Sequence, residues 1–187
     1  QIFQDFLDQL LENKTGIKGC TFRQLKEINN KTLRIGSCCL ANEKFYLLDY
    51  HQYPDMPISL ALRASFSIPL VFTLTVWQSK QYVDGGVLGN LPLKSFPNRN
   101  CIAFSLRSNA QQKKVSNKPQ NLYEYLLILF NIIINAAQYE NGNYIYFSKE
   151  LENVSIYEIN TLDIKTLDLN IDQQKINQVI EHGYHQM

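Results

Sequence analysis

The sequence predicts an α/β fold, and three observations support this prediction. Segments of strand character alternate with segments of helical periodicity over most of the chain. Hydrophobic residues make up 45% of the 187 residues, which is sufficient for a sizeable core. The length suits a single domain, 1–187. Basic and acidic residues nearly balance, 18 against 17, so we expect no nucleic-acid partner.

Four elements are predicted before residue 51. Apolar residues at helical spacing, a capping pattern and two apolar runs around a short turn carry these predictions. The elements are a helix from Ile2 to Leu11 that breaks at Asn13–Gly19, a helix ending near Ile28 behind a Thr21–Gln24 capping box, and a hairpin of strands 31–41 and 44–50.

The remaining chain continues the alternation of helices and strands. A polar stretch, 108–120, is predicted to be a surface loop. The apolar helix after it is too short for a bilayer span, so we expect it in a core. The elements are a helix 58–65 with Pro57 in its first turn, strands 80–84, 101–106 and 154–159, a helix 121–138, and a last helix capped by Asn170 or Asp172 that runs to about Gly183.

The four cysteines do not have the spacing of a metal site. Cys38 and Cys39 are adjacent on a predicted strand, so they point to opposite faces. Cys20 and Cys101 stand far from them in the sequence. We therefore expect reduced cysteines that serve as small core residues, no metal and no cofactor.

The segment around Asp84 carries the chemistry. Tyr82-Val83-Asp84 ends a short apolar strand on a carboxylate, and Gly85-Gly86 follows at once. A carboxylate at a strand end is a candidate general base, because the strand holds it and the turn exposes it. Asp-Gly is also a common turn dipeptide that needs no function. The residues of this segment alone leave both interpretations open.

A wider pattern resembles a known family. Ala64-Ser65-Phe66-Ser67-Ile68-Pro69 with Phe72, followed by Tyr82–Gly86 and by Asn90-x-Pro92, is similar to the second conserved block of patatin-like phospholipases. The resemblance implies a three-layer α/β/α sheet and a Ser–Asp dyad without histidine. Asp84 would be the base, and Gly85, Gly86, Asn90 and Pro92 would support its turn. The implied partner is a lipid with an acyl ester, with peripheral membrane contact.

The same block supplies candidate pocket residues. Arg63 would bind a lipid phosphate, or it forms a structural ion pair. Phe66, Phe72, Leu74 and Trp77 would line an acyl-chain pocket, or they pack in the core. The remaining candidates shape the site without acting as nucleophile, and they are Ser65, Ser67 and Pro69. The histidines, His51, His182 and His185, are expected in surface or cap positions.

Two elements of the family pattern are absent from this sequence, the nucleophile elbow and the Gly-rich oxyanion loop, and the family places both N-terminal to the segments present here. No G-x-S-x-G occurs, and Gly36-Ser37-Cys38-Cys39 is the nearest approach. The chain also begins with Gln1. We therefore expect the C-terminal part of a patatin-like domain, incomplete at its N-terminal side and poorly stable alone, with the nucleophile upstream. The alternatives are a non-catalytic remnant, a binding module, or an unrelated α/β protein with a chance Asp-Gly-Gly turn. A cytoplasmic protein and a secreted effector both stay open.

Overall fold

The computed structural model contains both helices and strands, which confirms the predicted α/β class. The chain clusters into two compact units, Gln1–Pro92 with Leu126–Asn141, and Leu93–Tyr125 with Gly142–Met187. A single domain over 1–187 stays a prediction. The structure describes residues 2–89, 91–96, 100–107, 119–141, 153–162, 164 and 171–186. Most of the predicted polar loop, 108–118, lies outside these ranges.

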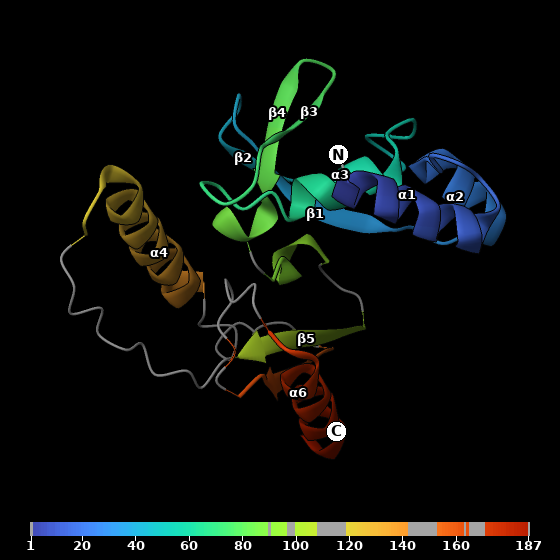
Figure 1. Ribbon diagram of the computed structural model, residues 1–187. Helices are drawn as coiled ribbons and strands as arrows, with labels where there is room; N and C mark the ends of the chain where they lie inside the picture. The colour runs from blue at the N-terminus through green and yellow to red at the C-terminus, as the bar shows by residue number, and fades with distance from the viewer. Residues whose placement is uncertain are drawn as a thin grey trace. The chain divides into compact units, whose positions relative to one another are not determined.

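The first unit is built on a four-stranded antiparallel sheet in the order β2-β1-β4-β3 (Figure 1). The predicted hairpin is confirmed as β1 and β2, although β1 is shorter than the predicted 31–41. In the β1–β4 pairing, Ser37 lies opposite Asp84 and Cys39 lies opposite Tyr82. The strands are β1 Arg34–Cys39, β2 Lys44–Asp49, β3 Thr75–Trp77 and β4 Lys80–Asp84.

Strand β3 was not predicted from the sequence. It pairs with β4 through a two-residue turn in which Gln78 and Ser79 have positive φ values of 47° and 62°. Glycine, asparagine and aspartate are the usual residues in such turns, because their backbones enter the left-handed region at low cost. The sequence therefore carries no turn signal at Gln78-Ser79, and the hairpin depends on pairing with β4.

Three helices accompany this sheet, and α1 and α3 contact each other (Figure 1). They are α1 Ile2–Thr15, α2 Phe22–Asn29 and α3 Ile58–Ser65. Helix α3 packs on β1 and β4. A continuous buried cluster joins the sheet and helices, and its residues are Cys20, Phe22, Ile35, Cys39, Leu48, Met56, Ile58, Ala61, Ala64 and Tyr82. Three of the four cysteines, Cys20, Cys38 and Cys39, are buried free thiols, as predicted.

Helix α1 continues past the predicted break at Asn13. The hydroxyl of Thr15 donates to the Leu11 carbonyl (2.7 Å), and the Gly16 N–H donates to the Glu12 carbonyl (2.8 Å). Gly16 has a φ of +73°, a conformation that glycine adopts at little cost and that ends the helix. The prediction at Asn13 was wrong because the helix continues until this glycine.

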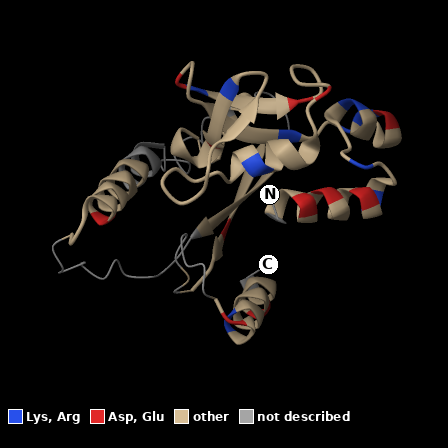
Figure 2. Cartoon of the chain, turned by 45° about the horizontal axis from the view of Figure 1, so that its top comes forward, with Lys and Arg blue, Asp and Glu red and all other residues tan. Residues whose placement is uncertain are grey.

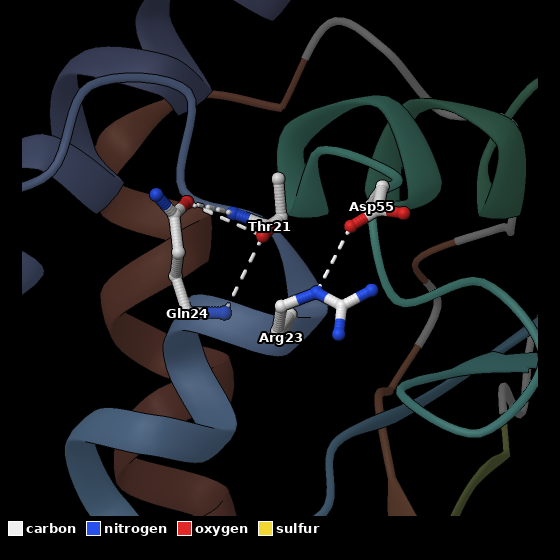
Figure 3. Close-up of polar contacts among 4 residues, drawn as sticks. All are labelled: Thr21, Arg23, Gln24 and Asp55. Carbon is white, nitrogen blue, oxygen red and sulfur yellow. Dashed lines mark hydrogen bonds and ion pairs between the residues drawn. The ribbon is translucent and has the colours of Figure 1, made fainter.

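The capping box at the start of α2 is confirmed (Figure 3). The Thr21 hydroxyl accepts the Gln24 N–H (3.3 Å), and the Gln24 amide oxygen accepts the Thr21 N–H (2.9 Å). Beside it, Arg23 Nε forms an ion pair with Asp55 Oδ1 (3.0 Å) on the surface (Figure 3). Two otherwise unpaired N–H groups are satisfied in this way, so the short helix has a fixed start.

Helix α3 has the predicted bounds, but Pro57 precedes it instead of lying in its first turn. Pro57 is the N-cap, with φ −60° and ψ 135°. Its carbonyl accepts the N–H groups of Leu60 and Ala61, both at 3.1 Å. Proline loses nothing at this position, because the N–H that it lacks would have no helical partner there.

The second unit contains a parallel pair of strands and a helix. Strand β5 pairs in parallel with β6, and α6 packs on β6. Each of the strands is one residue longer than predicted. Of the two caps predicted for the last helix, Asn170 lies outside the described residues. Asp172 provides a cap, because its Oδ1 accepts the Lys175 N–H (2.7 Å). The elements are a short 3₁₀ turn Leu93–Ser95, β5 Cys101–Arg107, β6 Val154–Asn160 and α6 Gln173–Gln186.

Helix α4, Leu122–Asn141, begins behind Asn121, whose Oδ1 accepts the Glu124 N–H (2.8 Å). Charged residues are sparse along it, whereas acidic residues recur along α1 (Figure 2). The predicted burial is wrong for part of α4, because Ile132 and Ile133 are 57% and 61% exposed. Among the described residues, no helix combines the length and apolar character that crossing a bilayer requires.

Candidate functional site

Asp84 is the last residue of β4, as predicted. Its own N–H donates to the Ser67 carbonyl (3.0 Å), and the chain then turns into a 3₁₀ helix, η1 Gly85–Val87. Carboxylate oxygen Oδ1 accepts the Gly86 N–H (2.7 Å). Among the described residues, no donor contacts the second oxygen, Oδ2. The carboxylate is therefore fixed by one oxygen and keeps the other free to accept a proton.

Two opposing effects act on the pKa of Asp84. Its partial burial raises the pKa above the usual carboxyl range, because the charged form loses hydration. The hydrogen bond from the Gly86 N–H lowers the pKa, since it favours the anion, but burial is the larger effect. A carboxylate with a raised pKa is a stronger base, as a catalytic proton acceptor requires.

Gly85 is required by close packing against β1. A Cβ atom at this position would lie 2.7 Å from the Gly36 carbonyl carbon and 2.8 Å from its oxygen. Backbone atoms cannot move aside as a flexible side chain can, so the turn after Asp84 accepts only glycine. Gly36 in turn lies under the Phe45 ring, where its own Cβ would come within 2.9 Å. The first glycine of Asp-Gly-Gly thus permits β1 and the turn to meet.

Strand β1 contacts the turn through two buried side chains. The Ser37 hydroxyl donates to the Val83 carbonyl (2.8 Å), and the Cys38 thiol lies 3.7 Å from the Gly85 carbonyl as a donor. Burial raises the pKa of the Cys38 thiol to about 11, and the negative charge of Asp84 adds to this rise. Cys38 therefore stays a thiol at neutral pH, and the hydroxyl of Ser37 is enclosed. Neither is placed as a nucleophile.

Ser67 meets the Asp84 strand but has a structural environment. It is 2% exposed, its hydroxyl donates to the Arg63 carbonyl (2.7 Å), and it shares a hydrogen bond with the Thr75 hydroxyl (3.1 Å). These contacts join the end of α3 to β3, while the Ser67 carbonyl holds the Asp84 N–H. The hydroxyl is thus hydrogen-bonded and away from solvent, and the role of Ser67 in shaping the site stays a prediction.

Arg63 connects α3 to its surroundings through neutral partners. Its guanidinium donates to the Thr73 hydroxyl (2.9 Å) and to the Gln4 side-chain oxygen (3.4 Å). Arg63 has no carboxylate partner among the described residues, so the structural ion pair considered for it is not formed there.

The remaining candidate pocket residues are not gathered around Asp84 by any described side-chain contact. The Phe66 ring packs edge-on against Phe3 at 4.7 Å between centroids, and Trp77 packs on the buried cluster. Phe72 and Leu74 are 46% and 37% exposed. Ser65, Pro69 and Pro92 are half-buried, and Asn90 lies outside the described residues. Their pocket role stays a prediction.

The histidines are divided between the two units. His51 is exposed beside the Tyr50 ring (5.4 Å between centroids) in the first unit, and His182 and His185 lie on α6 in the second unit. No described group of His, Cys, Asp and Glu residues could hold a metal ion. The chemistry that the first unit offers therefore centres on a single carboxylate.

The sequence did not reveal how Ser37 and Ser67 hold the strand that carries Asp84. Both act through contacts with distant segments, and the Ser37 bond spans 46 residues of sequence. The only local sign was the small-residue run Gly36-Ser37, which allows strand and turn to approach closely.

A family model described as patatin-like phospholipase matches residues 3–97, about half of the chain. The matched range contains Asp84, its turn and the strands that support it. The chain therefore belongs to the patatin-like phospholipase family, as the resemblance of its motifs predicts.

Two viral proteins are similar in sequence. The uncharacterized protein R571 of Acanthamoeba polyphaga mimivirus is 26% identical over 183 residues, which cover 95% of this chain and 59% of that protein. The probable lipid hydrolase 463L of Invertebrate iridescent virus 6 is 28% identical over 97 residues, 52% of this chain and 31% of that protein. The chain thus spans only part of the length of these relatives.

The crystal structure of VipD from Legionella pneumophila has a similar fold. It superposes with a TM-score of 0.54 at 15% sequence identity, over 89% of this chain and 34% of that chain. At this identity the likeness concerns the fold, and it supports the assignment of a patatin-like α/β architecture.

Proposed function

We propose that this chain supplies the general base of a lipid acyl hydrolase, with Asp84 as the base and a serine upstream of residue 1 as the nucleophile. The observation that carries the proposal is the carboxylate itself, bound at Oδ1 by the Gly86 N–H and open at Oδ2, with a pKa raised by burial. Family membership and the similarity to a probable lipid hydrolase support the same chemistry.

The reaction divides into two steps that share this base. The serine hydroxyl attacks the ester carbonyl carbon while its proton passes to Oδ2 of Asp84. The tetrahedral intermediate collapses, the C–O bond to the alcohol breaks, and that alcohol takes the proton from Asp84. Water then attacks the acyl-enzyme with Asp84 again as base, which releases a fatty acid and restores the serine.

A lipid substrate also requires contact with a lipid surface, and we propose that apolar side chains near the Asp84 turn provide it. Phe72 is 46% exposed in the segment between α3 and β3, and Leu88 is 46% exposed directly after η1. Val76 on β3 is 55% exposed. Exposed apolar side chains of this kind gain free energy when a lipid phase covers them.

The test uses the full-length protein with phosphatidylcholine vesicles and a fluorophosphonate probe, which bonds covalently to an activated serine hydroxyl. We expect fatty acid release, and we expect the probe on a serine outside residues 1–187. The matched measurement is the same labelling after the substitution Asp84→Asn, which should slow it strongly because the base is lost.

Two outcomes contradict the proposal. A probe attached to Ser37, Ser65 or Ser67 would place the nucleophile within this chain. Vesicle binding without fatty acid release would favour the non-catalytic binding module, which remains the second candidate.

A further inference from the structure

The peptide group that joins Val83 to Asp84 is held at both of its ends. Its carbonyl oxygen accepts the Ser37 hydroxyl (2.8 Å), and its N–H donates to the Ser67 carbonyl (3.0 Å). The orientation of this group determines where the Asp84 side chain leaves the backbone. Asp84 itself has φ −48° and ψ 132°, and the turn begins directly after it.

Ser37 provides the one side-chain bond of this pair. It is 0% exposed, and it lies directly opposite Asp84 in the β1–β4 register. Strand β1 is internal to the sheet, with β2 on one side and β4 on the other. A donor on an internal strand is held from both sides by strand pairing. Its bond to the Val83 carbonyl therefore fixes the end of β4, which carries the carboxylate, relative to β1.

The carbonyl of Gly85, the residue after Asp84, is also held by hydrogen bonds. The Gly85 oxygen accepts the N–H groups of Leu88 (3.2 Å) and Gly89 (2.9 Å), and the Cys38 thiol lies 3.7 Å from it. Backbone bonds therefore hold that side even if the thiol is removed. The Val83 carbonyl lies within the β1–β4 pairing, opposite Cys38, and the Ser37 hydroxyl is a side-chain donor to it in addition to that pairing.

We infer that Ser37 is a positioning residue, which orients the Val83–Asp84 peptide group so that the carboxylate faces the nucleophile. The inference rests on the proposed function of Asp84. It assigns the serine of Gly36-Ser37-Cys38-Cys39, the nearest approach in this chain to a nucleophile motif, to support of the base.

The expected signature is a loss of turnover without a loss of binding. Ser37→Ala removes the hydroxyl donor, while the Ser67 carbonyl still holds the Asp84 N–H and β1 still pairs with β4. The peptide group is then less tightly oriented, so the carboxylate occupies the position facing the nucleophile less often. Small misplacements of catalytic groups cost much in rate. We expect kcat to fall about tenfold, in line with the loss of one buried hydrogen bond, while KM stays within about twofold.

The experiment measures kcat and KM of the full-length protein with p-nitrophenyl butyrate as a soluble ester, well below the melting temperature of each variant. Ser37→Cys keeps nearly the same volume and a weaker donor, so its kcat should be intermediate. The matched control is Ser59→Ala, because the Ser59 hydroxyl on α3 is also buried, at 1% exposure, but has no hydrogen-bond partner among the described residues. Its kinetics should equal those of the unaltered protein.

The results separate this inference from the proposed function. If Asp84→Asn abolishes turnover but Ser37→Ala keeps kcat within twofold, the positioning role is wrong and the base stands. An equal fall in kcat for Ser59→Ala would also overturn the role. If Asp84→Asn retains turnover, the proposed function itself fails. Should Ser37→Ala not fold, Ser37→Cys decides, since an unchanged kcat in that variant contradicts the inference.

Discussion

The four-stranded sheet and the β5–β6 pair differ in how far their apolar side chains are exposed to solvent. In the first, Leu48 and Tyr82 are fully buried under α3 and its neighbours. In the second, alternate residues of β5 remain open, and Ile102, Phe104 and Leu106 are 66%, 54% and 69% exposed. The family match, residues 3–97, coincides with the well-packed region. Asp84 therefore lies in the part of the chain where apolar side chains are packed into a core.

The largest expected contrast comes from one substitution made in both regions. Leu48→Ala on β2 removes a fully buried side chain and should cost about 2–5 kcal/mol, because a cavity replaces packed atoms. Leu106→Ala on β5 should change stability by only about 0.5 kcal/mol or less, since that side chain is largely exposed. Urea unfolding of both variants measures the difference, and equal losses would mean that the two regions are packed alike.

The two regions should also respond oppositely when a methyl group is added to a glycine. Gly85→Ala would place Cβ 2.7 Å from the Gly36 backbone and should cost about 1–3 kcal/mol or more. Gly183→Ala on α6 would bring Cβ only to 3.9 Å from Ile159, an ordinary contact. It should stabilise that helix by about 0.5–1 kcal/mol, because alanine favours a helix interior. Thermal melting of both variants measures these changes, and a stabilising Gly85→Ala would contradict the close approach of strand and turn.

The smallest effect concerns the charge of Asp84. Its pKa is raised in the folded state, so its contribution to stability is fully present below the unfolded pKa, and it is lost as the pH rises through the folded pKa. Asp84→Asn keeps an acceptor for the Gly86 N–H and removes the buried charge. The variant should therefore melt slightly higher than the unaltered protein at neutral pH.

A pH series completes that comparison. The advantage of Asp84→Asn should disappear in acid, where Asp84 is protonated and uncharged as well. The control is Asp55→Asn, because Asp55 is exposed on the surface beside Arg23. A lower melting temperature for Asp84→Asn at neutral pH would show that other groups compensate the charge, and it would contradict the dominance of burial at Asp84.

Local signals made several elements of the first region predictable. The capping box at Thr21, the bounds of α3 and the strand ending at Asp84 all follow from short sequence patterns. The predicted break at Asn13 failed because one hydroxyl, that of Thr15, and a positive-φ glycine extended α1 to a later end. The residue at which a helix ends depends on such single contacts, and the spacing of apolar residues does not predict them.

Of the candidate site, the sequence predicted the carboxylate and its glycine turn but not the contacts that hold them. Asp84, Gly85 and Gly86 stand together in the sequence, and the family motif includes them. Strand β3 was not predicted, because its turn, Gln78-Ser79, lacks the glycine, asparagine or aspartate that usually indicates a hairpin. The hydrogen bond of Ser37 could not be predicted, because its partner, the Val83 carbonyl, is 46 residues away in sequence and meets it only through strand pairing.

The central claim is that Asp84 is the base of an ester hydrolase, and one measurement tests it most directly. The full-length protein and its Asp84→Asn variant are compared for release of fatty acid from phosphatidylcholine vesicles, with Asp55→Asn as the matched surface control. We predict that Asp84→Asn lowers the rate about 100- to 10,000-fold, the usual contribution of a general base, while Asp55→Asn leaves it unchanged. An Asp84→Asn protein that hydrolyses lipid within about twofold of the normal rate would contradict the claim.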